Sequence, residues 1–267
     1  MNAARLIRTR CAVLLATGIL AAALPASAKI IGTRPSSSST APGRDRLTTL
    51  LSPLYSMVIG SGVEFQTDNE QTEYGFPMLI EYSYSERLRF TVEPKCVSII
   101  GKTPDVRSVS GLGDLETSVD YEFLRERRYR PALSLEGKIK WPTAAHPDLG
   151  DPGIDYTLGL IASKDLVFVE LDLNALYTFA GNRAREDEVE ISLAAEWPLN
   201  HYVALITEVA NVTRMGRLRS GSRNEIEATV GLGWQVSKFL KLEQGVVFKE
   251  RGGWELIFAW EWSFGGD

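Results

Sequence analysis

Long hydrophobic runs, cysteine and excess basic charge are all lacking in this chain, and each absence excludes a class of protein. Among its 267 residues, only the extreme N-terminus approaches the roughly 18 consecutive apolar residues of a membrane-spanning helix, which excludes a polytopic helical membrane protein. Cys11 and Cys96 are too few for a disulfide framework. With 29 Lys and Arg against 34 Asp and Glu, the net charge of −5 does not indicate a nucleic-acid partner. The 44% hydrophobic and 24% charged residues are typical of a folded protein.

Residues 1–28 have the pattern of a secretory signal peptide. Three arginines precede an apolar run over residues 11–24, and Ala26-Ser27-Ala28 forms an A-x-A cleavage site. Cys11 begins the apolar run, whereas a lipoprotein cysteine ends it, so a lipid anchor is disfavoured. The alternative of a retained membrane anchor is disfavoured by the short apolar core. Cleavage would remove three basic residues and no acidic ones. The exported chain would then have 26 Lys and Arg against 34 Asp and Glu, a net charge of −8.

Residues 29–52 are rich in serine, proline and glycine, including the run from Ser36 to Ser39. Such a composition cannot bury enough apolar surface to order itself. We expect a flexible periplasmic arm, and a plug inside the folded domain is the alternative that the sequence leaves open. The domains are therefore a signal peptide, this arm or plug, and a folded domain over residues 53–267.

The folded domain alternates between apolar and polar residues, which is typical of strands with two chemically different faces. Between residues 167 and 179, for example, apolar side chains alternate with Glu170, Asp172 and Asn174. About twelve such blocks are predicted. They begin near residues 55, 76, 87, 113, 131, 153, 166, 188, 202, 225, 239 and 253.

The length of these blocks favours a membrane. Each is about 9 to 13 residues long, whereas soluble strands usually have about 5 or 6 and a tilted transmembrane strand needs about 9 to 11. Bacterial barrels have short periplasmic turns and longer outer loops. The odd-numbered connections, such as 66–75, 101–112 and 142–152, are predicted to be long and the even-numbered ones mostly tight, which places both termini in the periplasm.

The charged residues lie on one face of these blocks and are predicted to line a pore, because Lys or Arg facing the bilayer midplane costs about 2 to 4 kcal/mol. The candidate pore-lining residues are Glu81, Arg89, Glu93, Asp114, Glu116, Asp120, Glu136, Lys138, Glu170, Asp172, Glu190, Glu227 and Glu243. A soluble sandwich would turn the same charges toward water, so alternation alone does not decide between the two.

Aromatic residues favour the membrane because folding the blocks alternately up and down gathers them near two rims, as interface anchoring requires. One rim has Tyr82, Tyr84, Tyr121, Trp197, Tyr202, Trp234, Trp262 and Phe264, and the other has Trp141, Tyr156 and Trp254. In hydrocarbon an open sheet edge is costly, so the first and last strands must pair. Together these features predict an all-β, closed antiparallel up-and-down transmembrane β-barrel of about 12 strands in the cell outer membrane. Pro94 predicts a bulge or an early strand end.

Short motifs resemble a known outer-membrane family. They are Gly111-Leu112-Gly113-Asp114-Leu115, Lys140-Trp141-Pro142-Thr143 and Ser163-Lys164-Asp165-Leu166. On the basis of these motifs, residues 111–264 resemble the outer-membrane barrel family named for the MetA pathway of phenol degradation. The members of that family are described as transporters. A departure is Ala144, where glycine would be expected. The resemblance implies passage of small aromatic or hydrophobic molecules.

The function predicted from these features is passive passage of small molecules through the outer membrane. Barrels of about eight strands are filled by side chains and those of 16 to 18 leave a water channel, so about twelve would pass only small solutes. The surplus of inward carboxylates favours cations. A closed structural barrel, whose carboxylates pair with lumen bases, and a soluble periplasmic lipid-binding β-protein are the alternatives.

Enzymatic function is disfavoured, and no cofactor or metal is expected. A lipid hydrolase or acyltransferase needs a nucleophile with an adjacent base, and neither His146 nor His201 lies mid-strand to supply one. The cluster of His146, Asp148 and Asp151 matches no established metal site. Cys96 is interpreted as a small wall residue.

The expected partners are outer-membrane lipids and lipopolysaccharide, the outer-membrane assembly machinery, and an unknown small solute, with no nucleic acid. Guanidinium groups suit lipopolysaccharide phosphates. The loop arginines considered for this role are Arg183, Arg185, Arg214, Arg217, Arg219 and Arg223. The alternative is solvated charge or pairing with Glu186 and Asp187.

Overall fold

A computed structural model describes residues 56–68, 70–103, 107–182, 185–215, 223–250 and 252–264 of the chain. These residues form twelve β-strands and one short 3-10 helix, η1 (Pro147–Leu149). The strands are β1 (Met57–Thr67), β2 (Gln71–Ser85), β3 (Leu88–Gly101), β4 (Val109–Leu124), β5 (Ala132–Trp141), β6 (Asp155–Asp165), β7 (Glu170–Phe179), β8 (Asp187–Pro198), β9 (Val203–Met215), β10 (Arg223–Gln235), β11 (Leu240–Lys249) and β12 (Trp254–Phe264). No helix among the described residues is long and apolar enough to cross a membrane.

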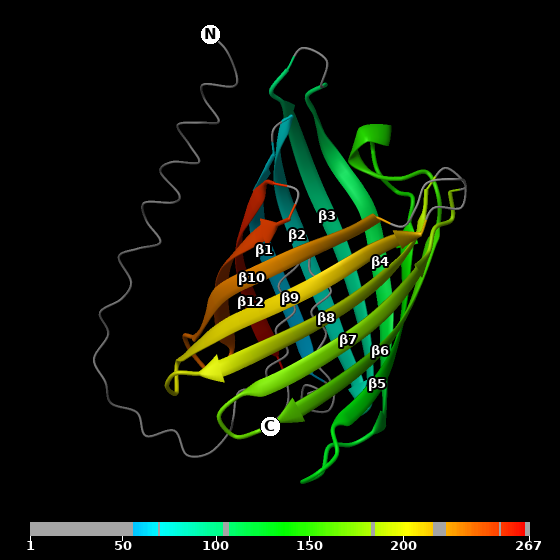
Figure 1. The fold of residues 1–267 in the computed structure, drawn as a ribbon. Helices are drawn as coiled ribbons and strands as arrows, with labels where there is room; N and C mark the ends of the chain where they lie inside the picture. Colours follow the sequence, from blue (N-terminus) through cyan, green and yellow to red (C-terminus); the bar gives the residue numbers. More distant parts are fainter. Residues whose placement is uncertain are drawn as a thin grey trace. The chain divides into compact units, whose positions relative to one another are not determined.

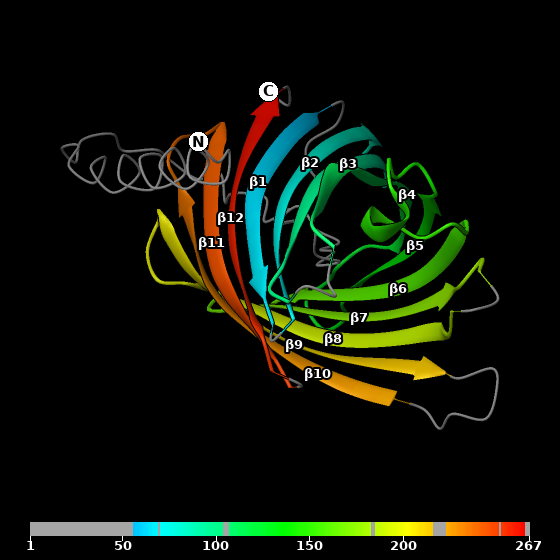
Figure 2. The ribbon, with the colours of Figure 1, turned by 90° about the horizontal axis from the view of Figure 1, so that it is seen from above.

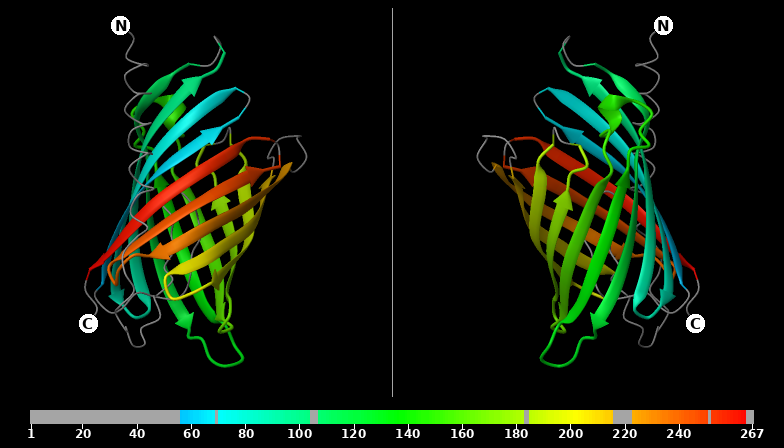
Figure 3. Two further views of the ribbon diagram at one scale, coloured as in Figure 1. Left: turned by 90° about the vertical axis from the view of Figure 1, so that its left-hand side faces the viewer. Right: turned by 90° about the vertical axis from the view of Figure 1, so that its right-hand side faces the viewer.

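The twelve strands form one closed antiparallel barrel in which each strand pairs with its neighbours in sequence (Figure 1). Closure is made by β1 and β12, whose pairing runs from Met57 opposite Phe264 to Thr67 opposite Trp254. Figure 2 shows this ring of strands from above, and Figure 3 shows how steeply they tilt. The predicted fold class, with pairing of the first and last strands, is confirmed. Every strand edge thereby finds a partner, as a hydrocarbon solvent demands.

Each strand presents an apolar side outward and a polar side inward. In β7, Asp172 and Asn174 are completely buried while Leu173 between them is 49% exposed. A charged residue buried beside an exposed leucine is the reverse of a water-soluble protein and is typical of a barrel wall in lipid. The exposed belt is built from large apolar side chains, including Ile80, Phe90, Leu160, Leu193, Val209, Val230, Leu256 and Phe258.

The strand register brings aromatic residues together at both rims. At one end, Met57 stands opposite both Tyr82 and Phe264, and Trp262 stands opposite Leu240. At the other end, Trp254 stands opposite Thr67 and Phe248. All the predicted interface aromatics are exposed except Trp234, which is half-buried. Their placement fits the two predicted girdles, because amphipathic rings prefer headgroup depth.

Two local predictions have different outcomes. Pro94 lies at a register shift between β3 and β4, so the predicted bulge is confirmed. The long first connection predicted over residues 66–75 is wrong, because β1 continues to Thr67 and β2 begins at Gln71. The Asp68 carboxylate accepts hydrogen bonds from the backbone N–H groups of Glu70 at 2.7 Å and Gln71 at 2.8 Å, which stabilises a tight turn there. The alternation of long and short connections is therefore weaker than the sequence indicated.

The signal peptide predicted at residues 1–28 and the arm predicted at 29–52 lie outside the described residues. Both stay predictions. The described part of the folded domain begins at Ser56 and ends at Phe264.

Candidate functional site

The inner face of the barrel is dominated by buried acids. Of the charged residues that are almost fully buried in the described part of the chain, ten are acidic and two are basic. The acids are Glu64, Glu81, Asp120, Glu122, Glu136, Asp155, Asp172, Glu208, Glu243 and Glu261, and the bases are Arg89 and Lys138. A low-dielectric wall with this surplus gives the lumen a negative potential.

The predicted pore-lining residues all belong to the inward sides of their strands. Seven are buried: Glu81, Arg89, Asp120, Glu136, Lys138, Asp172 and Glu243. The other six are half-buried: Glu93, Asp114, Glu116, Glu170, Glu190 and Glu227. The structure thus gathers on one surface residues that lie on eight different strands. Whether this surface conducts solute stays a prediction.

Ion pairs join neighbouring strands along the inner wall. The Arg89 Nε donates to the Asp120 Oδ2 at 3.0 Å, and the Arg89 Nη1 lies 3.6 Å from the Glu81 Oε2. On the next strand pair, the Lys138 Nζ lies 3.6 Å from a carboxylate oxygen of Glu116. Part of the negative potential of the lumen is therefore compensated locally by the few inward bases.

The connection between β5 and β6, residues 142–154, lies against the inner wall. Its helix η1 contacts β4 and β3, and Figure 2 shows it inside the ring of strands. The Asp114 carboxylate on β4 accepts hydrogen bonds from the backbone N–H groups of Ala144 at 3.1 Å and Asp151 at 2.9 Å. The backbone N–H of Ala145 also donates to the Leu112 carbonyl at 2.8 Å. The β5–β6 connection is thus attached to the wall at both ends.

Small residues permit this close approach. A Cβ on Gly111 would lie 3.1 Å from the Leu149 side chain, and one on Gly113 would lie 3.3 Å from the Leu149 carbonyl oxygen. Opposite them, a Cβ on Gly150 would lie only 2.5 Å from the Asp114 carboxylate. Leu149 is buried as a result, at 7% exposure. Glycines on both surfaces therefore allow the connection to pack against β4.

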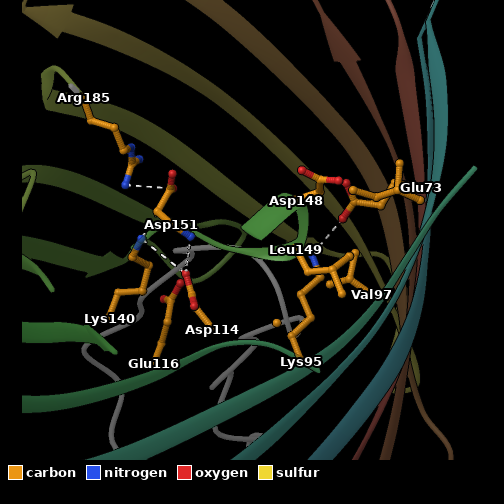
Figure 4. Close-up of a pocket in the computed structure, with 12 residues that line it drawn as sticks. Glu73, Lys95, Val97, Asp114, Glu116, Lys140, Asp148, Leu149, Asp151 and Arg185 are labelled. Atoms are coloured by element: carbon orange, nitrogen blue, oxygen red, sulfur yellow. Dashed lines mark hydrogen bonds and ion pairs between the residues drawn. The ribbon is translucent and has the colours of Figure 1, made fainter. Parts of the chain in front are cut away.

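A cavity of about 240 Å³ opens beside this connection (Figure 4). Its apolar lining includes Val97 and Leu149, which lie side by side in Figure 4. The charged side chains that line it are Glu73, Lys95, Asp114, Glu116, Lys140, Asp148, Asp151 and Arg185. They come from β2, β3, β4, β5 and the connections before β6 and β8.

The bases that line the cavity are surrounded by carboxylates. The Lys140 Nζ lies 2.9 Å from Asp155, 3.4 Å from Asp114 and 3.5 Å from Asp151. The Arg185 guanidinium pairs with Asp151 at 3.0 Å and also with Asp155. One network thus ties β4, β5, the β5–β6 connection and the β7–β8 connection together.

Sequence reasoning missed part of this network. Asp151 and Leu149 were assigned only to the long connection predicted over residues 142–152. The available signal was the position of Leu149 and Asp151 immediately before and after Gly150, a small residue that allows tight packing.

For two of the loop arginines, the structure shows other partners than Glu186 and Asp187, which were the alternative considered to lipopolysaccharide phosphates. Arg185 instead pairs with Asp151 and Asp155, and Arg214 pairs with Glu188 at 3.0 Å and Glu225 at 3.1 Å. The partners lie on adjacent strands or connections, which sequence spacing does not reveal. Arg183, Arg217 and Arg219, and the side chain of Arg223, lie outside what the structure describes.

The histidines lie in connections. The His146 Nδ1 lies 3.4 Å from the Asp148 Oδ2 and accepts a hydrogen bond from the Asp148 N–H at 3.2 Å, which caps η1. Within the described ranges, no group of three His, Cys, Asp or Glu side chains is arranged to hold a metal ion. His201 lies in the β8–β9 turn, and Cys96 is a free, exposed thiol on β3.

Comparison with solved structures finds the same fold in known channels. An outer-membrane channel from Pseudomonas putida F1 matches with a TM-score of 0.66 and 12% identity, over 80% of this chain and 97% of that one. The NanC porin matches with a TM-score of 0.57 and 8% identity, over 76% and 98% of the two chains. The KdgM porin matches with a TM-score of 0.56 and 11% identity, over 78% of this chain and 99% of that one. It has also been solved in complex with oligogalacturonate. No family model and no curated protein matches the chain.

These matches and the apolar outer belt identify the fold as a closed twelve-stranded outer-membrane β-barrel. The barrel resides in the cell outer membrane, with its apolar side toward lipid. The neighbours with this fold are an outer-membrane channel and two porins. The likeness to the MetA-pathway family stays a prediction, since no family model matches.

Proposed function

We propose that this barrel is a passive outer-membrane channel that favours small cations. The observation that carries the proposal is the surplus of ten acids over two bases among the buried charged side chains that the structure describes. Such a surplus on the wall of a narrow lumen raises the local concentration of cations and repels anions. The channel folds of the P. putida protein, KdgM and NanC support passage of small molecules.

Export and assembly are part of the proposal. The basic and apolar pattern of residues 1–28 supports secretion through the inner membrane. After cleavage, residues 29–52 would form a periplasmic arm or a plug, and the assembly machinery would insert the barrel among outer-membrane lipids and lipopolysaccharide. No catalytic residue or cofactor is needed for this function.

The solute class can be tested with sugars of similar size and different charge. Proteoliposomes containing the refolded full chain are placed in isosmotic glucosamine, N-acetylglucosamine or glucuronate, and swelling rates are compared. Glucosamine, a cation near neutral pH, is expected to enter fastest and glucuronate slowest. Faster entry of glucuronate would contradict cation preference.

A closed structural barrel is the second candidate. The specific observation that favours it is the burial of inward side chains, such as Arg89 at 2% exposure. In that case proteoliposomes would swell with none of the three sugars, and the channel proposal would be wrong.

The motif likeness within residues 111–166 supports relation to the MetA-pathway family and hence passage of small aromatic or hydrophobic compounds. An aromatic amine is the solute class that agrees with both features, because its ring matches the compounds that the family likeness implies and its positive charge is favoured by the acidic lumen. Benzylamine entering faster than benzoate would support this combination, and the reverse order would contradict it.

A further inference from the structure

The β5–β6 connection lies against the inner wall of the barrel, and the Asp114 carboxylate accepts two of the hydrogen bonds that hold it there. We propose that this connection is the constriction that selects solute, that Asp114 holds it in place, and that the cavity beside it takes small organic cations. This inference rests on the proposed channel function and adds where the selection is made.

The size of the cavity limits what it can take. At about 240 Å³ it is smaller than the roughly 300 to 1,000 Å³ of sites for drug-sized ligands, so only a small solute fits. Its apolar lining, Val97 and Leu149, is buried at 8% and 7% exposure. A solute with a short apolar part would find a dry contact surface there.

The bases that line the cavity already have partners. Lys95 lies 2.8 Å from Glu64 and 3.7 Å from Glu73. Lys140 has three carboxylates and Arg185 has two, as described above. An entering anion would have to compete with these resident carboxylates for every base.

Three of the five acids in the lining, in contrast, remain accessible to solvent. The side chains of Glu116, Asp148 and Asp151 are 39%, 48% and 44% exposed, respectively. Among the described residues, the ion-pair partner of Asp148 is its neighbour His146. The charged side chains that line the cavity are five acids and three bases, so a cation that enters meets a surplus of carboxylates, and this asymmetry favours organic ammonium ions.

The position of the constriction depends on Asp114. Its carboxylate accepts from two backbone N–H groups of the connection, those of Ala144 and Asp151, and also lies 3.4 Å from the Lys140 ammonium. Removing this carboxylate leaves both N–H groups without that acceptor. Asp114 is a positioning residue in this account, because it holds the connection and the cavity wall together.

Gly150 gives an independent way to disturb the same contact. A Cβ at this position would lie 2.5 Å from the Asp114 carboxylate and 2.6 Å from the Ala144 Cβ. The backbone φ of Gly150 is −171°, which is extended and open to any residue. Gly150→Ala therefore displaces the connection by contact alone and leaves every charge in place.

The test is block of K⁺ current by tetramethylammonium through the refolded full chain in planar bilayers. Wild type is expected to carry K⁺ current that tetramethylammonium reduces. Asp148→Asn is expected to weaken block about fivefold in dissociation constant, the effect of one exposed charge at close range. Asp114→Ala and Gly150→Ala are expected to raise K⁺ conductance and abolish block, because the connection leaves the wall.

Glu86→Gln is the matched control. It removes a carboxylate that is 62% exposed and lies in the β2–β3 turn, far along the strands from the β5–β6 connection. Conductance and block are expected to equal those of wild type. Heat-modifiable gel mobility identifies the folded fraction of each variant before measurement.

Two results separate this inference from the channel proposal. If wild type conducts K⁺ but block is absent, or is the same in Asp148→Asn, Asp114→Ala and Gly150→Ala, the constriction inference is wrong and the channel remains. If wild type and both Asp114→Ala and Gly150→Ala carry no current, the proposed function itself is wrong.

Discussion

Arg89 and Asp120 stand directly opposite each other on β3 and β4 and form a hydrogen-bonded ion pair of 3.0 Å, with both side chains only 2% exposed. Each of them belongs to a strand whose opposite face is exposed and apolar, as Phe90 and Tyr121 illustrate at 41% and 46% exposure. Compared with a water-soluble protein, the barrel therefore has its charged and apolar faces exchanged, and this pair shows the exchange most directly. Charge is kept inside, where it must be paired, and hydrocarbon contacts the outside.

The Arg89–Asp120 pair gives the first prediction. Asp120→Asn is expected to lower the free energy of unfolding by about 3 kcal/mol, because removing one partner of a buried pair leaves a poorly compensated charge. Urea titration of the barrel in lipid vesicles measures this change in the free energy of unfolding. Glu86→Gln, which breaks the exposed pair between Glu86 and Arg125, should cost less than about 1 kcal/mol. Equal losses in both variants would contradict the burial of the first pair.

The lipid-facing belt gives the second prediction. Leu193 lies near the middle of β8 and is 53% exposed, opposite Leu173 and Val209. Leu193→Arg is expected to destabilise the barrel by about 2 to 4 kcal/mol, because the guanidinium would face the bilayer midplane. Leu199→Arg, in the turn after β8, should cost about 0 to 1 kcal/mol. Vesicle-based urea titrations compare the two. An unchanged Leu193→Arg barrel would indicate that water covers this face.

Glycine at close strand contacts gives the third prediction. A Cβ on Gly231 would lie 2.6 Å from the Gln244 carbonyl oxygen of the neighbouring strand, whereas one on Gly137 would meet nothing within 4 Å. Gly231→Ala is therefore expected to cost about 1 to 3 kcal/mol in unfolding free energy through overpacking. Gly137→Ala should be tolerated. If Gly137→Ala proves the more damaging, the register between β10 and β11 is wrong.

The β1–β2 turn gives a prediction about pH. The backbone N–H of Gln71 donates to the Asp68 carboxylate and lowers the pKa of that group below its ordinary value of 3.8, with a smaller contribution from the N–H of Glu70. A lowered pKa in the folded state stabilises the turn above pH 3.8, and this stabilisation is lost as the pH falls through the lowered value. A carboxyl-carbon NMR titration should place the Asp68 midpoint below 3.8.

The variant Lys102→Met checks the cause of that shift. The charge of Lys102 also lowers the pKa of Asp68, but its effect is smaller than that of the Gln71 N–H. The Asp68 midpoint should therefore stay below 3.8 in this variant. A return to the ordinary value would mean that the lysine, and not the turn geometry, holds the carboxylate ionised.

Much of the fold was predictable because alternate residues of a transmembrane strand face lipid and lumen, and therefore alternate between apolar and polar. Predicted strand starts near 87, 131 and 188 lie within one residue of Leu88, Ala132 and Asp187. Connections were less predictable. The period-two pattern does not locate the end of β1 or the start of β2, because residues 66–73 are all polar and were therefore interpreted as part of one long connection.

The site was predictable only in part, for a physical reason. Inward residues follow from alternation, so Asp114 and Glu116 were found. The packing of Leu149 and Gly150 against β4 depends on contacts between segments 37 residues apart, such as the hydrogen bond between Asp151 and Asp114. No local pattern encodes such contacts, and only the closed strand order brings the segments together.

The most direct test of the account is the reversal potential of the refolded full chain in a planar bilayer with a KCl gradient. An acidic lumen that conducts solute predicts a potential displaced toward the K⁺ equilibrium value, because K⁺ passes more readily than Cl⁻. A potential displaced toward the Cl⁻ equilibrium value would contradict the account, and so would a bilayer that stays silent after insertion of folded barrels.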